Sequence, residues 1–134
     1  PPIRRMKLAL QHYLLVFVGA GLGGVLRYWL SGLAHRWLPP PFPYGTLAVN
    51  LLGSFVIGVV MYGIATHKTL QPELRILLTT DLCGGLTTFS TFALETVNLA
   101  VDRQYAYAGL NMLLNVTLTL VAVIAALKLS RFFA

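Results

Sequence analysis

The sequence predicts an all-α membrane protein with four transmembrane helices, the third of which is broken. Of its 134 residues, 57% are hydrophobic and only 10% are charged, whereas a soluble domain carries about 25% charged residues. The apolar residues form four runs, each near or above the roughly 20 residues that cross about 30 Å of hydrocarbon. No hydrophilic stretch is long enough for a second domain, so residues 1–134 are expected to form a single transmembrane domain.

The four expected spans are joined by short connections. They cover residues 8–33, 45–66, 74–101 and 105–127, and the second and fourth carry no charge. A proline-rich turn over residues 37–44 joins the first two spans, and its aromatic residues are typical of a membrane interface.

The basic residues lie at the ends of the apolar runs and form no stripe, although the net charge is +6. This distribution favours anionic lipid headgroups over nucleic acid as the partner. Four spans place both termini on one side, where seven of the ten Lys and Arg residues fall. The excess predicts cytoplasmic termini in a multi-pass protein of a cell inner or plasma membrane. The seven are Arg4, Arg5, Lys7, Lys68, Arg75, Lys128 and Arg131, and the other three are Arg27, Arg36 and Arg103.

No catalytic set is visible, so the protein is not expected to be an enzyme. Ser90 has no histidine near it in sequence, and no Gly-x-Ser-x-Gly elbow occurs. The single cysteine, Cys83, excludes an intramolecular disulfide. Glu95 and Asp102 are seven residues apart and could share a helix face, but no general-acid partner joins them.

Small residues in the first span predict close helix packing. Gly19 and Gly23, and likewise Ala20 and Gly24, are four residues apart and share a helical face. Because four thin helices enclose little space, oligomerisation is expected, and a tight monomeric bundle is the alternative.

Polar residues recur at helical spacing inside the apolar runs. Asn111, Asn115 and Thr119 follow one another every four residues, which places them in one stripe of the fourth span. Asn50 and Ser54 do the same in the second span. Such groups often form hydrogen bonds between helices, worth about 0.6 kcal/mol each. Two asparagines and a threonine exceed that need, so a polar pathway is the favoured interpretation.

The third span contains two glycines followed by hydroxyl and aromatic residues, which make a weak helix. A break at membrane depth must be buried in protein or line a polar cavity. It frees carbonyls that can bind a cation and amides that can bind an anion. Phe89 and Phe92 share a face, and their positive ring edges can contact a small anion. Lipid contact or simple packing is the alternative for these two rings.

The segments GTLAVNLLGSF (residues 45–55) and GGLTTFSTF (84–92), together with Glu95, closely resemble the bacterial Fluc (CrcB) fluoride channels. The similarity spans most of the chain and includes Arg27 late in the first span. It implies a fluoride-selective ion channel that exports fluoride passively, rejects chloride and protects against fluoride toxicity. It also implies an antiparallel, dual-topology homodimer with two pores, each lined by both subunits.

The resemblance also implies roles for individual residues. Phe89 and Phe92 match two pore phenylalanines, and Asn50 matches a pore asparagine of the second span. Asn115 and Thr119 fall on a polar track of the fourth span. The remaining pore candidate, Asn111, falls near a family tyrosine position.

A structural sodium ion is the cofactor that the resemblance implies. The backbone carbonyls of Gly84 and Thr87 match those that hold this ion at the dimer centre. The ion would place a fixed positive charge deep in the protein, which favours anions. Neutral amide and hydroxyl donors suit fluoride, because a pore must replace its water yet release it.

Two features depart from the family pattern. Asp81 stands where the family usually has glycine, and a charged aspartate at a helix centre costs about 2.5–3.5 kcal/mol. It is expected to face water, to be protonated or to pair with Arg27. Asn115 stands where a serine is common. In addition, the uneven basic charge fits free dual topology poorly, which leaves a paired homologous chain as an alternative to the homodimer.

Two other functions compete with the channel. A four-span multidrug exporter needs a carboxylate in its first span, and this first span has none. A structural subunit without transport activity needs neither the asparagine stripe nor a broken third span.

Overall fold

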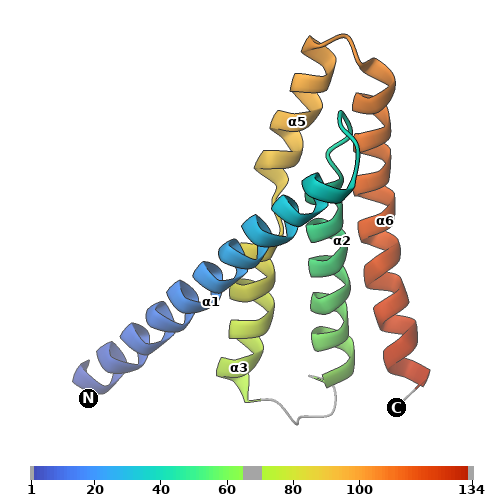
Figure 1. Cartoon of the computed structure of the whole chain (residues 1–134). Helices are drawn as coiled ribbons and strands as arrows, with labels where there is room; N and C mark the ends of the chain where they lie inside the picture. Colours follow the sequence, from blue (N-terminus) through green and yellow to red (C-terminus); the bar gives the residue numbers. More distant parts are fainter. Residues whose placement is uncertain (1, 65–70, 133–134) are drawn as a thin grey trace.

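The computed structural model of the chain describes residues 2–64 and 71–132, which contain helices and no strand. The elements, in order, are α1 (Pro2–Trp37), α2 (Tyr44–Gly58), η1 (Val59–Ile64), α3 (Pro72–Ile76), η2 (Leu77–Cys83), α4 (Gly84–Leu86), α5 (Phe89–Val101) and α6 (Tyr105–Phe132). The η segments are wider π-helical turns, and each continues an α-helix without interruption. The chain therefore runs as α1, α2–η1, α3–η2–α4, α5 and α6 (Figure 1).

Three of the described helical stretches are long and apolar enough to cross a membrane. They are Met6–Trp37, Tyr44–Ile64 and Tyr105–Phe132, and they correspond to the first, second and fourth expected spans. This confirms a multi-pass, all-helical membrane protein. The expected third span is divided into α3–η2–α4 and α5, neither of which is a long apolar helix by itself. Residues 65 and 66 of the second expected span, and Lys68, lie outside the described residues.

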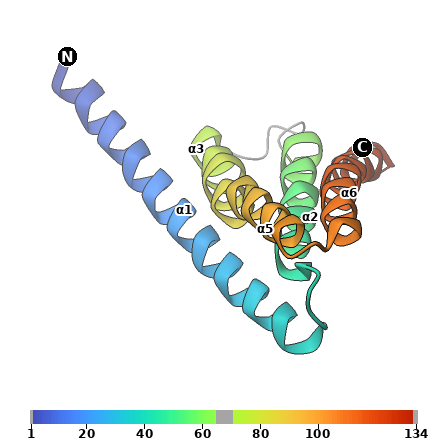
Figure 2. The same cartoon turned by 90° about the horizontal axis from the view of Figure 1, so that it is seen from above.

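The start of α1 and the end of α6 lie at the same end of the molecule, and the α1–α2 and α5–α6 connections lie at the other (Figure 1). Seen from above, α1 lies along one side of the other helices, and its N-terminal half projects beyond them (Figure 2).

α1 contacts the η2–α4 segment almost backbone to backbone. A Cβ atom added at Gly23 would overlap the carbonyl oxygen of Leu82, and one added at Gly85 would overlap that of Ala20. A Cβ added at Gly19 would lie 2.5 Å from the Cβ of Asp81. The predicted close approach through Gly19, Ala20 and Gly23 is therefore confirmed. Gly24 has no part in it, because a Cβ there would meet nothing within 4 Å.

Polar side chains are buried beside apolar ones in the interior of the described chain, and many large apolar side chains lie at its surface. Threonine, asparagine and aspartate side chains are buried, while large apolar side chains of α1, such as Phe17, Tyr28 and Trp29, are exposed. A protein surrounded by lipid shows this pattern, because lipid tails accept apolar side chains and buried polar groups find partners within the protein.

Candidate functional site

The break in the third span lies at Thr87 and Thr88. Both residues are extended, with φ −82° and ψ 157° at Thr87 and φ −151° and ψ 119° at Thr88. The break therefore lies within the expected segment GGLTTFSTF (84–92), but not at its two glycines. Gly84 and Gly85 are helical residues of α4. Glycine weakens a helix by only about 1 kcal/mol, so side chains from elsewhere must interrupt it.

Asn50 of α2 satisfies both backbone polar groups of Thr88. The Thr88 N–H donates to Oδ1 of Asn50 over 2.7 Å, and Nδ2 of Asn50 donates to the Thr88 carbonyl over 3.1 Å. Both residues are buried. A buried backbone group without a partner costs about 1–3 kcal/mol, so this pair of bonds allows extended backbone at this depth.

Two further side chains hold the break. The hydroxyl of Thr88 accepts the N–H of Thr91 over 3.2 Å, which caps the start of α5. On the opposite side, Nη1 of Arg27 in α1 donates to the Thr87 carbonyl over 3.3 Å. The break is thus tied to α1, to α2 and to α5 itself.

The polar stripe of α6 forms a chain of hydrogen bonds that starts at Asn50. Nδ2 of Asn50 donates to Oδ1 of Asn115 over 2.9 Å, and Nδ2 of Asn115 donates to Oδ1 of Asn111 over 2.8 Å. Nδ2 of Asn111 then donates to Oγ1 of Thr96 over 2.9 Å. The stripe therefore links α2, α6 and α5. Hydrogen bonding between helices, the alternative to a polar pathway, is thus present.

A cavity of about 360 Å³ lies beside this chain and the break. It collects five of the six predicted pore residues, and only Asn111 is absent from its lining. The lining is Asn50, Ser54, Thr87, Thr88, Phe89, Phe92, Asn115, Val116, Thr119 and Leu120. Hydroxyl and amide groups thus share one space with two aromatic rings, inside an otherwise apolar group of helices.

The rings of Phe89 and Phe92 contact each other at one wall of the cavity. Their centroids are 5.3 Å apart and their planes are inclined by 51°. Phe92 is 9% exposed, whereas Phe89 is 79% exposed. One ring therefore belongs to the interior of the chain, and the other is presented at its surface.

Comparison with known proteins identifies the family. The family model "CrcB-like protein, Camphor Resistance (CrcB)" matches residues 14–127. The chain belongs to the CrcB family. A protein of Serratia proteamaculans (strain 568) named "Fluoride-specific ion channel FluC" is 47% identical over 120 residues, which cover 90% of this chain and 94% of that protein.

Two further relatives carry the same name. The protein of Granulibacter bethesdensis is 43% identical over 122 residues, covering 91% of this chain and 96% of its own. The protein of Pectobacterium atrosepticum is 49% identical over 102 residues, covering 76% and 80%. The similarity therefore extends over at least 80% of the length of each of these relatives.

In this CrcB-family chain, the carbonyls of Gly84 and Thr87 fit a cation site. In a continuous helix they would accept the amides of Thr88 and Thr91, but those amides donate to Oδ1 of Asn50 and to the Thr88 hydroxyl. The backbone at Gly84 is open on one side, because a Cβ there would meet nothing within 4 Å. The Thr87 carbonyl already accepts Arg27, but a carbonyl oxygen has two lone pairs.

The Asp81 side chain is buried without a partner. It is 1% exposed, and neither carboxyl oxygen has a hydrogen bond partner. It does not face water, and Arg27 donates to Thr87 instead of pairing with it. Two of the three expected arrangements are therefore absent. Asp81 also lies outside the lining of the cavity that holds the predicted pore residues.

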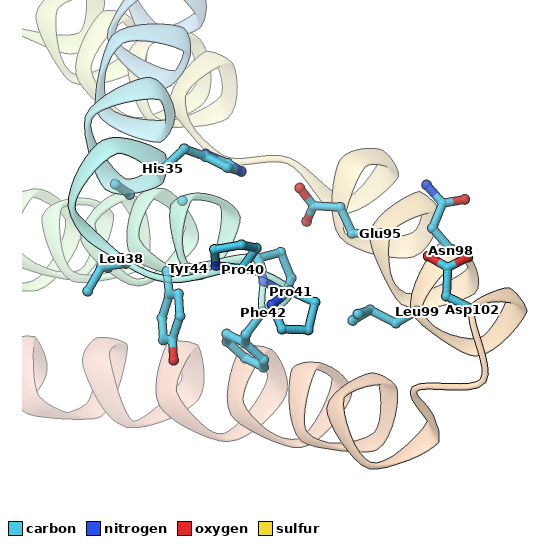
Figure 3. A pocket seen from close by; sticks show the side chains of 13 residues that line it. His35, Leu38, Pro40, Pro41, Phe42, Tyr44, Glu95, Asn98, Leu99 and Asp102 are labelled. Atoms are coloured by element: carbon cyan, nitrogen blue, oxygen red, sulfur yellow. The ribbon is translucent and has the colours of Figure 1, made fainter.

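A second cavity, of about 350 Å³, lies near the α1–α2 and α5–α6 connections and is lined by His35, Glu95, Asn98 and Asp102 among others (Figure 3). Oγ1 of Thr46 donates to Oε1 of Glu95 over 2.8 Å. The interpretation that Glu95 and Asp102 share a face is confirmed. Sequence reasoning assigned this cavity no role. In the sequence, the one feature that could have pointed to this cavity is that Thr46 and Glu95 both belong to the regions that resemble the fluoride channels.

Proposed function

We propose that this chain is a fluoride-selective ion channel that lets fluoride leave the cell passively and so lowers its cytoplasmic concentration. The observation that supports this most is the cavity at the break, where amide and hydroxyl groups meet the Phe89–Phe92 pair. The relatives' shared name, "Fluoride-specific ion channel FluC", points to the same anion.

The cavity suits a small anion that must be bound weakly. Its lining contains no charged side chain, so the anion would meet neutral donors and the positive edges of rings. The amide hydrogens of Asn50 and Asn115 are donated within the protein. A passing fluoride would exchange for one of these bonds, which contribute only about 1 kcal/mol net. Such exchange favours release as well as entry.

The working unit in this proposal is an antiparallel, dual-topology homodimer of four-span subunits with two pores. In each subunit α3–η2–α4 and α5 together make the third crossing. The exposed ring of Phe89 supports a shared pore, because it lies at the edge of a cavity that one chain leaves open. A dimer of this chain with a homologous chain is the alternative favoured by its uneven basic charge.

A structural sodium ion at the dimer centre is part of the proposal. Gly84 and Thr87 of each subunit would contribute backbone carbonyls to it. When bound, the ion would supply a fixed positive charge that favours anions over cations in the nearby pores. The dimer is proposed to lie in the inner or plasma membrane.

Fluoride efflux from liposomes tests this function. Purified protein is reconstituted with potassium fluoride inside, and efflux is started with a potassium ionophore and followed with a fluoride electrode. We expect rapid loss of fluoride, whereas chloride-loaded liposomes keep their chloride. Fluoride loss at the rate of protein-free liposomes would contradict the proposal.

A further inference from the structure

The geometry points to Asn50 as the positioning residue that creates the break in the third span, and thereby sets the phenylalanine pair and frees the Gly84 carbonyl. The inference rests on the proposed function, which gives the break a use and includes the sodium ion that serves as its probe. Asn50 was predicted to line the pore, and here it acts on the backbone that carries other pore residues.

The Asn50 side chain replaces a peptide group of the helix. Its carboxamide has one carbonyl acceptor and an NH₂ donor, which are the polar groups of a backbone amide. At Thr88 both are used at once, with the N–H donated over 2.7 Å and the carbonyl accepting over 3.1 Å. Its second amide hydrogen goes to Asn115, which fixes the orientation of the group.

Close packing of α2 at the break brings Asn50 within reach. Gly53 lies three residues further along α2, so it shares a face with Asn50. A Cβ atom at Gly53 would overlap Cγ2 of Thr87. The small residue therefore lets the α2 backbone approach the break, and Asn50 bonds to the residue that follows Thr87.

The capture of the Thr88 amide has two consequences. In a continuous helix this amide would donate to the Gly84 carbonyl, so its transfer to Asn50 leaves that carbonyl available to a cation. It also ends α4 and lets α5 restart at Phe89 with a new direction. The positions of both rings therefore depend on Asn50, whose hydrogen bonds go to the backbone of Thr88 and to Asn115.

Sodium-dependent thermal stability of the purified dimer tests the inference. The unfolding midpoint is measured against sodium concentration, with choline chloride keeping the ionic strength constant. We expect sodium to raise the midpoint of the wild type. In Asn50→Leu the apparent sodium affinity should fall at least roughly tenfold, because the Thr88 amide is no longer held away from Gly84.

Two variants separate positioning from a general loss of stability. Asn50→Asp keeps an oxygen that accepts the Thr88 amide and should keep most of the sodium response. Asn111→Leu removes another buried asparagine of the same chain of bonds, one that bonds to Asn115 and Thr96 instead of to Asn50, and it should keep the wild-type sodium affinity. If Asn50→Leu does not fold, the smaller Asn50→Ser replaces it, because a serine hydroxyl does not reach as far as the Asn50 Oδ1 that accepts the Thr88 amide. Loss of the sodium response in Asn50→Ser with its retention in Asn50→Asp would support the inference, and retention in both would overturn it.

Two results would overturn it. One is a wild-type sodium affinity in Asn50→Leu. The other is a wild type that does not respond to sodium at all, because the freed carbonyl would then hold no cation. Either result leaves the fluoride channel itself to be judged by the liposome efflux of the wild type, so the two failures are distinguishable.

Discussion

Thr88 and Asp81 are two buried polar residues seven positions apart in the chain, and their polar groups are satisfied to opposite degrees. The backbone groups of Thr88 are both matched by Asn50. The carboxyl oxygens of Asp81 have no partner. The contrast shows that burial alone does not identify a functional polar group in a membrane protein. The matched group is the one that lies in the lining of the cavity.

The two neighbouring helices explain the difference. At the break, α2 presents an asparagine whose side chain can reach the backbone. At Asp81, α1 presents Gly19, which leaves room for the aspartate but offers no side-chain donor. The nearest basic residue along α1 towards its C-terminal end is Arg27, eight residues on and about 12 Å along the helix, and it donates to Thr87.

The largest effect on stability is expected from removing the Asn50 side chain that bonds to the Thr88 backbone. Asn50→Leu should lower the free energy of unfolding by about 2–5 kcal/mol, because it removes the partners of two buried backbone groups and of the Asn115 carbonyl oxygen. Thermal unfolding in detergent measures this. A variant as stable as the wild type would show that the backbone groups of Thr88 find other partners. Thr88 and Asp81 would then not differ in how much their hydrogen bonding contributes to stability.

The close contact between α1 and the segment that contains Asp81 can be tested with alanine substitutions at two glycines. Gly85→Ala should cost about 1–3 kcal/mol, because its Cβ would overlap the carbonyl oxygen of Ala20. Gly21→Ala on the exposed face of α1 is the matched control, since its Cβ meets open space and alanine favours the helix. Equal melting temperatures of the two variants in sodium-free buffer would contradict this packing.

The Asp81 side chain is expected to lower the free energy of unfolding. Asp81→Ala is expected to raise the free energy of unfolding by about 1–3 kcal/mol, because it removes a buried polar group that has no partner. Asp81→Gly should gain about 1 kcal/mol less, since glycine weakens the helix. Chemical denaturation provides the measurement, and a loss of stability in Asp81→Ala would mean that the carboxyl has a stabilising partner in the assembled protein.

The smallest effect on stability is expected at the exposed ring. Phe89→Ala should slow fluoride efflux about tenfold, equivalent to about 1.4 kcal/mol, while the melting temperature changes little because the ring is at the surface of the chain. Phe92→Ala should also slow efflux but with a loss of stability, since that ring is buried. Unchanged efflux in both variants would remove the ring edges from the pathway.

Residue spacing predicted much of this structure, because helical periodicity is local. The α6 stripe of Asn111 and Asn115 and the close approach at Gly19 and Gly23 follow from residues four apart. The sequence also located the weak segment, residues 84–92, but not the two residues at which the helix stops. Glycine propensity shows where a helix is weak and does not show which hydrogen bond is replaced. That replacement joins Asn50 to Thr88 across 38 residues.

The pairing of Thr46 with Glu95 spans 49 residues and was missed for the same reason. Asp81 is a different case. Its side chain was recognised as unusual from the sequence, but its burial against α1 depends on where two helices cross. Local patterns therefore identify the residues, and the contacts between helices decide what each of them does.

Fluoride efflux from liposomes containing either the wild type or Asn50→Leu tests the central claim most directly, namely that an amide from α2 builds the break on which fluoride passage depends. Both proteins are reconstituted at equal density and checked for intact dimer. We predict rapid efflux with the wild type and a rate within about tenfold of protein-free liposomes with Asn50→Leu. Equal rates for the two proteins would contradict the claim.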